Sequence, residues 1–175
     1  MNIRTYTHIK LRSNNGFTLF EIIIVITIMS VLSGIAYVGF SNAIAKRNLA
    51  NGVKDLQSAF ENSRTMARTE KKIYGVLIDF TKNKFILFED KNKSYTYTNT
   101  DRIVRESTMP AKVELYRGLC GSYYGQGYNY KLMTLIFYPN GTTNGSTENW
   151  VKIRGKNDIA TVYLDRYTGR VKTTL

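Results

Sequence analysis

The stretch GFTLFE at residues 16–21, followed by the uncharged run IIIVITIMSVLSGIAYVGF at residues 22–40, determines how this chain is organised. A helix needs about 20 apolar residues to cross the ~30 Å hydrocarbon layer of a membrane. Residues 22–40 are therefore predicted to form one transmembrane helix. Glu21 lies at the start of this run, where a carboxylate is unfavourable unless it has a partner or a function.

Residues 1–16 are polar and basic, and they lack the apolar periodicity of a packed element. We expect them to be a cytoplasmic leader, because basic residues such as Arg4, Lys10 and Arg12 favour that side of a first transmembrane helix. The chain is then single-pass in the inner (cytoplasmic) membrane. Its N-terminus lies in the cytoplasm, and its C-terminal domain is periplasmic or extracellular.

The helix is expected to continue beyond the membrane. No proline occurs between residues 17 and 72, and apolar residues recur at helical spacing at Leu49, Val53, Leu56, Phe60 and Ala67. Charged and polar residues fill the intervening positions, so this half is amphipathic whereas residues 22–40 are apolar all round. Residues 17–72 are thus predicted to form one long helix, whose distal face packs on a domain.

Residues 73–175 are predicted to form a β-rich extracytoplasmic globular domain. Its apolar runs alternate with turns that contain Asn and Gly, so antiparallel hairpins are the expected connections. The stretches 90–105 and 118–131 are predicted loops, and the seven candidate strands are residues 73–80, 84–89, 112–116, 132–138, 150–154, 161–165 and 170–173. The expected fold class is α+β, with the long N-terminal helix packed on an antiparallel β-sheet of about seven strands.

Composition limits the chemistry of the chain. The 175 residues suffice for one domain and an anchor, and 25 Lys and Arg against 13 Asp and Glu give a charge of +12 that attracts polyanions. Cys120 is the only cysteine, so no internal disulfide can form. His8 is the only histidine and lies in the leader, so the mature domain has no imidazole for acid–base catalysis or zinc binding. No catalytic residue, cofactor or metal site is predicted, and the chain is not expected to be an enzyme.

Two ordinary explanations of the N-terminus fit the sequence less well. A secretory signal peptide could be cut after Ala43-Ile44-Ala45, but residues 22–40 exceed the ~7–15 apolar residues usual in such peptides. The amphipathic pattern also continues past Ala45. A plain uncleaved anchor fits the length, but it gives no reason for a glycine directly before FTLFE.

The junction resembles that of type IV prepilins and pseudopilins, and the resemblance rests on Gly16, Phe17 and Glu21. It implies that a prepilin peptidase cuts after Gly16 and that Phe17 becomes a methylated N-terminus. A glycine before the cut lets the backbone approach the protease without a Cβ obstacle. It also implies that Glu21 pairs with the Phe17 α-ammonium of a neighbouring subunit. The alternative for Glu21 is an interfacial residue that reaches toward headgroups.

The implied partners are prepilin peptidase, other pilins or pseudopilins, the inner-membrane assembly platform and membrane lipid.

One departure from the family is Val38, which stands where many pilins have a proline. A single cysteine also excludes the C-terminal disulfide loop of major pilins. Residues 90–101 have the oxygen spacing of a calcium loop, but Tyr95 replaces its glycine and Lys91 and Lys93 add positive charge, so calcium is not predicted.

The C-terminal half is similar to minor pseudopilins of the GspH and FimT type, through LIFYPNGT at residues 135–142, residues 150–154 and residues 161–172. That resemblance implies an antiparallel sheet against the end of the long helix. The function it implies is that of a minor subunit of a type II secretion or type IV pilus system. A secretion pseudopilus and a retractable pilus are not distinguished at this point.

Basic residues crowd the C-terminus, and the candidate DNA-binding residues are Arg154, Lys156, Arg166, Arg170 and Lys172. Cations neutralise phosphates and aromatic faces stack on bases, and Tyr163 and Tyr167 are interleaved with them. The sequence GRVK at residues 169–172 is similar to the Gly-Arg-x-Arg tail of FimT-type proteins used in DNA uptake, with Lys172 in place of the second arginine. A DNA-binding minor pilin for natural transformation and a solvated basic hairpin both remain open.

Overall fold

The computed structural model describes residues 17–119, 131–144 and 148–174. These residues form one helix, α1 (Leu19–Glu70), and eight strands. The strands are β1 (Tyr74–Asp79), β2 (Lys84–Glu89), β3 (Arg102–Thr108), β4 (Glu114–Leu119), β5 (Leu132–Phe137), β6 (Glu148–Arg154), β7 (Ile159–Asp165) and β8 (Val171–Thr174). The predicted leader, 1–16, and most of the predicted loop 118–131, with Cys120, lie outside the described residues.

The helix α1 runs through two compact units of the chain, Met1–Phe40 and Ser41–Leu175. In the second unit its apolar stripe is buried as predicted, since Leu49, Val53, Leu56, Phe60 and Ala67 are at most 3% exposed. The helix ends at Glu70 because Lys71 adopts a left-handed backbone (φ 57°), a common way to end a helix.

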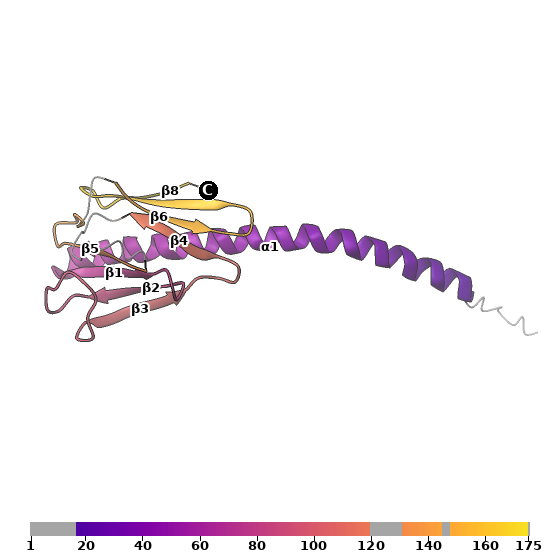
Figure 1. The fold of residues 1–175 in the computed structure, drawn as a ribbon, viewed down its shortest axis with the longest axis horizontal. Helices are drawn as coiled ribbons and strands as arrows, with labels where there is room; N and C mark the ends of the chain where they lie inside the picture. The colour runs from indigo at the N-terminus through magenta and orange to yellow at the C-terminus, as the bar shows by residue number, and fades with distance from the viewer. Residues whose placement is uncertain (1–16, 120–130, 145–147, 175) are drawn as a thin grey trace, which may run out of the picture. The chain divides into compact units, whose positions relative to one another are not determined.

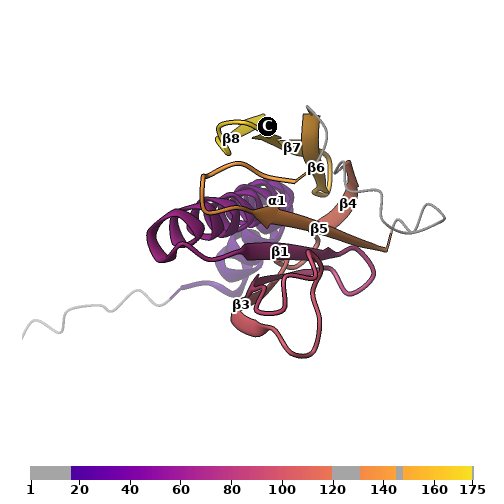
Figure 2. The ribbon, with the colours of Figure 1, turned by 90° about the vertical axis from the view of Figure 1, so that its left-hand side faces the viewer.

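The strands form two antiparallel sheets, in the orders β3-β2-β1-β5 and β4-β6-β7-β8 (Figure 1). They pack against residues 41–70 of α1 from two sides, as the turned view in Figure 2 also shows. The inner face of the first sheet buries Val76, Phe85 and Leu87 against α1, and the second sheet contributes Val151 and Val162. The α+β class is confirmed, with a core made of one helix face and two sheet faces.

The structure differs from the prediction in having eight strands in two sheets. The strand that the sequence did not reveal is β3, which overlaps the predicted loop 90–105. Its sequence RIVREST contains few apolar residues, because β3 is an edge strand whose side chains are largely exposed. Charged side chains on an edge strand also discourage pairing with other chains.

The far face of the first sheet has a small core of its own. Leu77, Ile86, Phe88 and Ile136 are buried there, beneath Tyr97 and Tyr138. Gly75 is required at this place, since a Cβ on it would lie 2.4 Å from the Phe88 ring. Because both faces are covered, β1 from Tyr74 to Ile78 and β2 from Phe85 to Phe88 are buried and do not alternate between apolar and polar residues.

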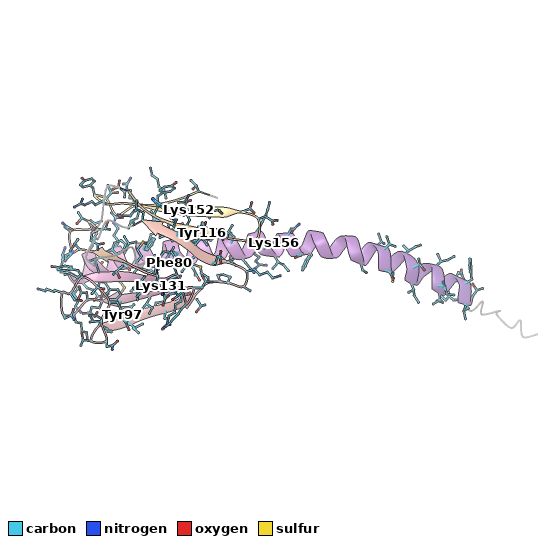
Figure 3. All side chains as sticks on the ribbon, in the orientation of Figure 1. Phe80, Tyr97, Tyr116, Lys131, Lys152 and Lys156 are labelled. Atoms are coloured by element: carbon cyan, nitrogen blue, oxygen red, sulfur yellow. The ribbon has the colours of Figure 1, made fainter. Side chains whose placement is uncertain are left out.

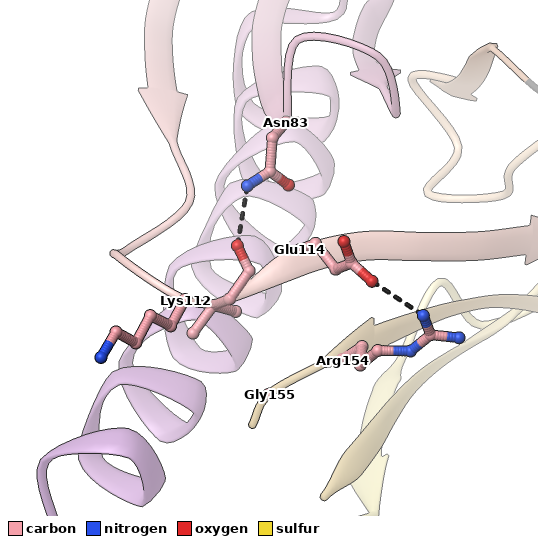
Figure 4. Close-up of a pocket in the computed structure, with 6 residues that line it drawn as sticks. Asn83, Lys112, Glu114, Arg154 and Gly155 are labelled. Atoms are coloured by element: carbon pink, nitrogen blue, oxygen red, sulfur yellow. Dashed lines mark hydrogen bonds and ion pairs between the residues drawn. The ribbon is translucent and has the colours of Figure 1, made fainter. Parts of the chain in front are cut away.

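Asn83 joins the two sheets (Figure 4). It lies in the turn between β1 and β2, with a left-handed backbone (φ 53°). Its Nδ2 donates to the Val113 carbonyl at 2.7 Å, and its Oδ1 accepts from the Leu115 amide at 2.8 Å. One amide side chain thus holds the start of β4 beside the first sheet.

We expect Asn83→Gly to lower the free energy of unfolding by about 1–3 kcal/mol, because it removes both hydrogen bonds but tolerates the left-handed backbone. Asn83→Ala should cost roughly 1–2 kcal/mol more, since alanine is strained at positive φ. Urea unfolding of the full chain in detergent measures both. Lys82→Gly is the control in the same turn, and an Asn83→Gly protein as stable as wild type would contradict the role of this side chain.

Candidate functional site

The start of α1 is built around Thr18 and Glu21. Glu21 Oε2 accepts hydrogen bonds from the Thr18 amide at 3.1 Å and from Thr18 Oγ1 at 3.2 Å. Thr18 Oγ1 in turn accepts from the Glu21 amide at 3.2 Å. This is a capping box, with Thr18 as N-cap and Glu21 three residues later, and a carboxylate there also complements the helix dipole.

The capping box gives a role to Thr18, which the sequence motif alone had not singled out. Thr18 positions the Glu21 carboxylate, and the Thr-x-x-Glu spacing was the signal that could have revealed it. Only Oε2 is used, and among the described residues no hydrogen bond reaches Oε1. Gly16 lies outside the described residues, and Phe17 is the first residue described, with 83% of its surface exposed.

The helix beyond Glu21 is apolar on all sides. Its hydroxyl groups donate to carbonyls four residues earlier, at 2.8 Å from Thr27, 2.8 Å from Ser30 and 2.7 Å from Ser33. No described side chain of residues 19–34 is buried. Within the described residues α1 is the single helix long and apolar enough to cross a membrane.

Two of the candidate DNA-binding residues are engaged within the domain, where β6 passes into β7. The Arg154 guanidinium forms an ion pair with Glu114 at 3.0 Å (Figure 4). It also lies 3.4 Å from the Tyr116 ring centroid. Lys156 donates to Asn42 Oδ1 of α1 at 3.2 Å. The shallow pocket beside Arg154 is lined by Asn83, Lys112, Val113, Glu114 and Gly155.

Arg166 and Arg170 lie at the other end of the second sheet, around the turn from β7 to β8. Asp165 accepts from the Thr168 amide at 2.7 Å and from its hydroxyl at 2.8 Å, and these bonds lower the pKa of the Asp165 carboxyl. Gly169 completes the turn at φ 62°, packed so closely on α1 that a Cβ would lie 2.8 Å from Arg64 Cδ. The five predicted residues therefore do not form one patch.

Lys172 belongs to a third location, the exposed face of the second sheet. It stands beside Tyr163 on β7, which stands beside Trp150 on β6. Lys152, two residues further along β6, has its Nζ 5.3 Å from the Trp150 ring (Figure 3 labels Lys152 and Tyr116). This row of aromatic rings and cations includes Trp150. Trp150 was not grouped with the basic residues from the sequence alone.

The loop with calcium-like spacing holds itself together through its carboxylates. Asp90 accepts from the amides of Ser94 at 3.1 Å and Tyr95 at 2.9 Å. Asp101 accepts from the amides of Lys91 at 3.1 Å and Thr98 at 2.7 Å. These oxygens serve backbone donors, and the described part of the chain has no group of three or more His, Cys, Asp or Glu able to hold a metal ion.

Comparisons with known proteins agree with this arrangement. The family model described as the prokaryotic N-terminal methylation motif matches residues 11–37. A sequence comparison with curated proteins finds no match.

Two solved structures of the minor pseudopilin EpsH, from the type 2 secretion system of Vibrio cholerae, have a similar fold. The first is 14% identical in sequence, and the alignment covers 73% of this chain and 96% of the EpsH chain, with a TM-score of 0.52. The second is 12% identical, covers 73% and 94%, and has a TM-score of 0.52. The type IV minor pilin FimU of Pseudomonas aeruginosa PAO1 is 12% identical, covers 74% and 90%, and has a TM-score of 0.53.

The motif lies at the start of α1, and the fold similarity covers about three quarters of the chain. The chain thus carries a prokaryotic N-terminal methylation motif, and its fold is similar to that of the minor pseudopilin EpsH and the minor pilin FimU.

Proposed function

We propose that the chain is a non-catalytic minor subunit of a type II secretion pseudopilus or a type IV pilus. Prepilin peptidase processes it after Gly16, and it assembles with other pilins or pseudopilins through its N-terminal helix, on an inner-membrane assembly platform. The observation that carries this proposal is the Thr18–Glu21 capping box at the head of an apolar helix. A carboxylate is thereby held in a defined orientation where it is otherwise unfavourable.

The exposed apolar side chains of the helix are consistent with two successive surroundings of the subunit, first lipid and then the helices of other subunits. Phe40 at the end of the uncharged run is 70% exposed, and Ile22 at its start is 45% exposed. Lipid covers such side chains while the subunit is single-pass in the inner membrane, with its N-terminus cytoplasmic. In the filament, the helices of neighbouring subunits replace the lipid.

The free oxygen of Glu21 supports a contact between subunits. Cleavage after Gly16 creates an α-ammonium on Phe17, beside the positive end of its own helix dipole, where a cation is disfavoured. A neighbour's Glu21 offers Oε1 as a counter-charge while Oε2 keeps capping its own helix. The pair neutralises both groups as the helix leaves the lipid, and it sets the register of one helix against the next.

Replacing Gly16 by valine should block processing, because a branched side chain obstructs approach of the backbone to the peptidase. Immunoblots of membranes should show only a precursor that retains residues 1–16. Asn15→Val, one position earlier, is the control and should be cut. Normal maturation of the Gly16→Val chain would contradict cleavage at this bond.

Glu21→Gln separates the charge of this residue from its capping role, because the amide oxygen can still accept the Thr18 hydrogen bonds. We expect the variant to be processed and to remain in the membrane, but to be at least about tenfold depleted from sheared filaments or pseudopili, as for Glu21→Ala. Glu61→Gln, on the exposed face of α1, is the matched control. Normal incorporation of Glu21→Gln would favour an interfacial role for Glu21.

DNA binding is a second candidate function, and the row formed by Trp150, Tyr163 and Lys172 favours it. Aromatic rings and cations on one exposed sheet face suit phosphates and bases. Arg154 is less suited, since its guanidinium is already paired with Glu114 and lies on the Tyr116 ring. Lys152, Arg166, Arg170 and Lys172 make no ion pair within the described residues, and they would carry the interaction with DNA.

Salt-dependent gel shifts of the full chain in detergent test this function. Arg170→Ala with Lys172→Ala should weaken binding and reduce the slope of log affinity against log salt by about 2, because two fewer phosphates are neutralised. Arg154→Ala should change the slope little. If the wild-type chain does not shift DNA at physiological salt, DNA binding is refuted and only the structural role stands.

A further inference from the structure

Two turns of the β domain contact α1 immediately after its apolar run. Lys156, in the turn between β6 and β7, donates to Asn42 at 3.2 Å (Figure 3). Asn48 of α1 donates to the carbonyl of Ala111, in the turn between β3 and β4, at 3.2 Å. A Cβ on Gly155 would lie 3.2 Å from Leu49 Cδ2. The tips of both turns therefore lie beside residues 42–49.

Four cations gather at this end of the domain, and we call them the collar: Lys46, Arg47, Lys112 and Lys156. All four are exposed, and none has an ion pair within the described residues. The carboxylates next to the two turns are Glu114, which is paired with Arg154 at 3.0 Å, and Asp158, which is exposed and has no ion pair there. The collar is therefore strongly positive.

Lys46 and Arg47 follow residue 40 by only six and seven residues in the sequence. At the 1.5 Å rise per residue of a helix, that spacing corresponds to about 9–11 Å. Headgroups extend roughly 5–8 Å on each side of the hydrocarbon layer. In physiological salt, the attraction between charges extends a further ~8 Å before it is screened. The collar is thus within reach of lipid phosphates if residues 22–40 span the membrane.

We propose that the collar docks the β domain on anionic phospholipid headgroups while the subunit waits in the membrane. This inference rests on the membrane span of the proposed function. Each Lys or Arg near an anionic membrane surface favours the docked state by roughly fivefold. The collar contains no aromatic side chain for base stacking, unlike the row of Trp150 and Tyr163, so lipid phosphate suits it better than single-stranded nucleic acid.

Hydrogen exchange of the full processed chain, one copy per nanodisc, tests the docking. Nanodiscs of phosphatidylcholine are compared with nanodiscs of phosphatidylglycerol. Amides of residues 111–113 and 155–158 should exchange at least about fivefold more slowly in the anionic lipid. The difference should vanish at about 1 M salt, where screening acts within ~3 Å.

A matched pair of variants isolates the collar. Replacing Lys46, Arg47, Lys112 and Lys156 by glutamine should abolish the lipid dependence, although Asn42 remains in place. A control with the same loss of charge elsewhere, Lys152, Arg166, Arg170 and Lys172 to glutamine, should retain it. Equal exchange in both lipids, or equal loss in the control, would overturn the proposal.

Two further outcomes are distinguishable from these. Slow exchange that requires two chains per disc would identify a second copy as the occupant and overturn lipid docking. Protection of residues 22–40 in both lipids reports the span itself. Failure of that protection refutes the span and the proposed function with it, whereas a protected span with lipid-independent turns refutes the collar alone.

Discussion

An apolar helix that its own chain does not cover is the constraint on which the other features depend. No described side chain of residues 19–34 is buried, and the hydroxyls of Thr27, Ser30 and Ser33 are satisfied within the helix. Such a surface is stable in lipid or against other helices, but not in water. The same helix changes character near residue 41, and from Leu49 onward one face becomes the centre of a water-soluble domain.

This change within one helix assigns different tasks to its two halves. The first half leaves one charged group at its start, and Thr18 orients that group. The second half organises two sheets that meet through Asn83, so the turns between strands are held at defined positions along α1. One set of turns lies beside residues 42–49, and the Asp165–Gly169 turn lies against Arg64. The basic charge of the chain is accordingly divided between the two ends of the domain and one sheet face.

The long helix, its buried stripe and seven of the strands were predictable, because their signals are local periodicities. The edge strand β3 was not, since an exposed edge has little need of apolar residues. The division into two sheets could not be predicted either, because the alternation of residues along a strand does not indicate which strand pairs with it. The same limit applied to the basic residues: Glu114 lies 40 residues from Arg154 in sequence, and Asn42 lies 114 residues from Lys156. The capping box is the exception, because Thr-x-x-Glu is a local signal that could have been read.

Intact-mass analysis of the protein isolated from native filaments or membranes tests the central claim most directly. That claim is that cleavage after Gly16 leaves the apolar helix on the chain and exposes the α-amine of Phe17, four residues before Glu21. The account predicts a chain that begins at Phe17 and carries one added methyl group. A chain that begins at Lys46, or one that keeps residues 1–16 within the assembled filament, would contradict it.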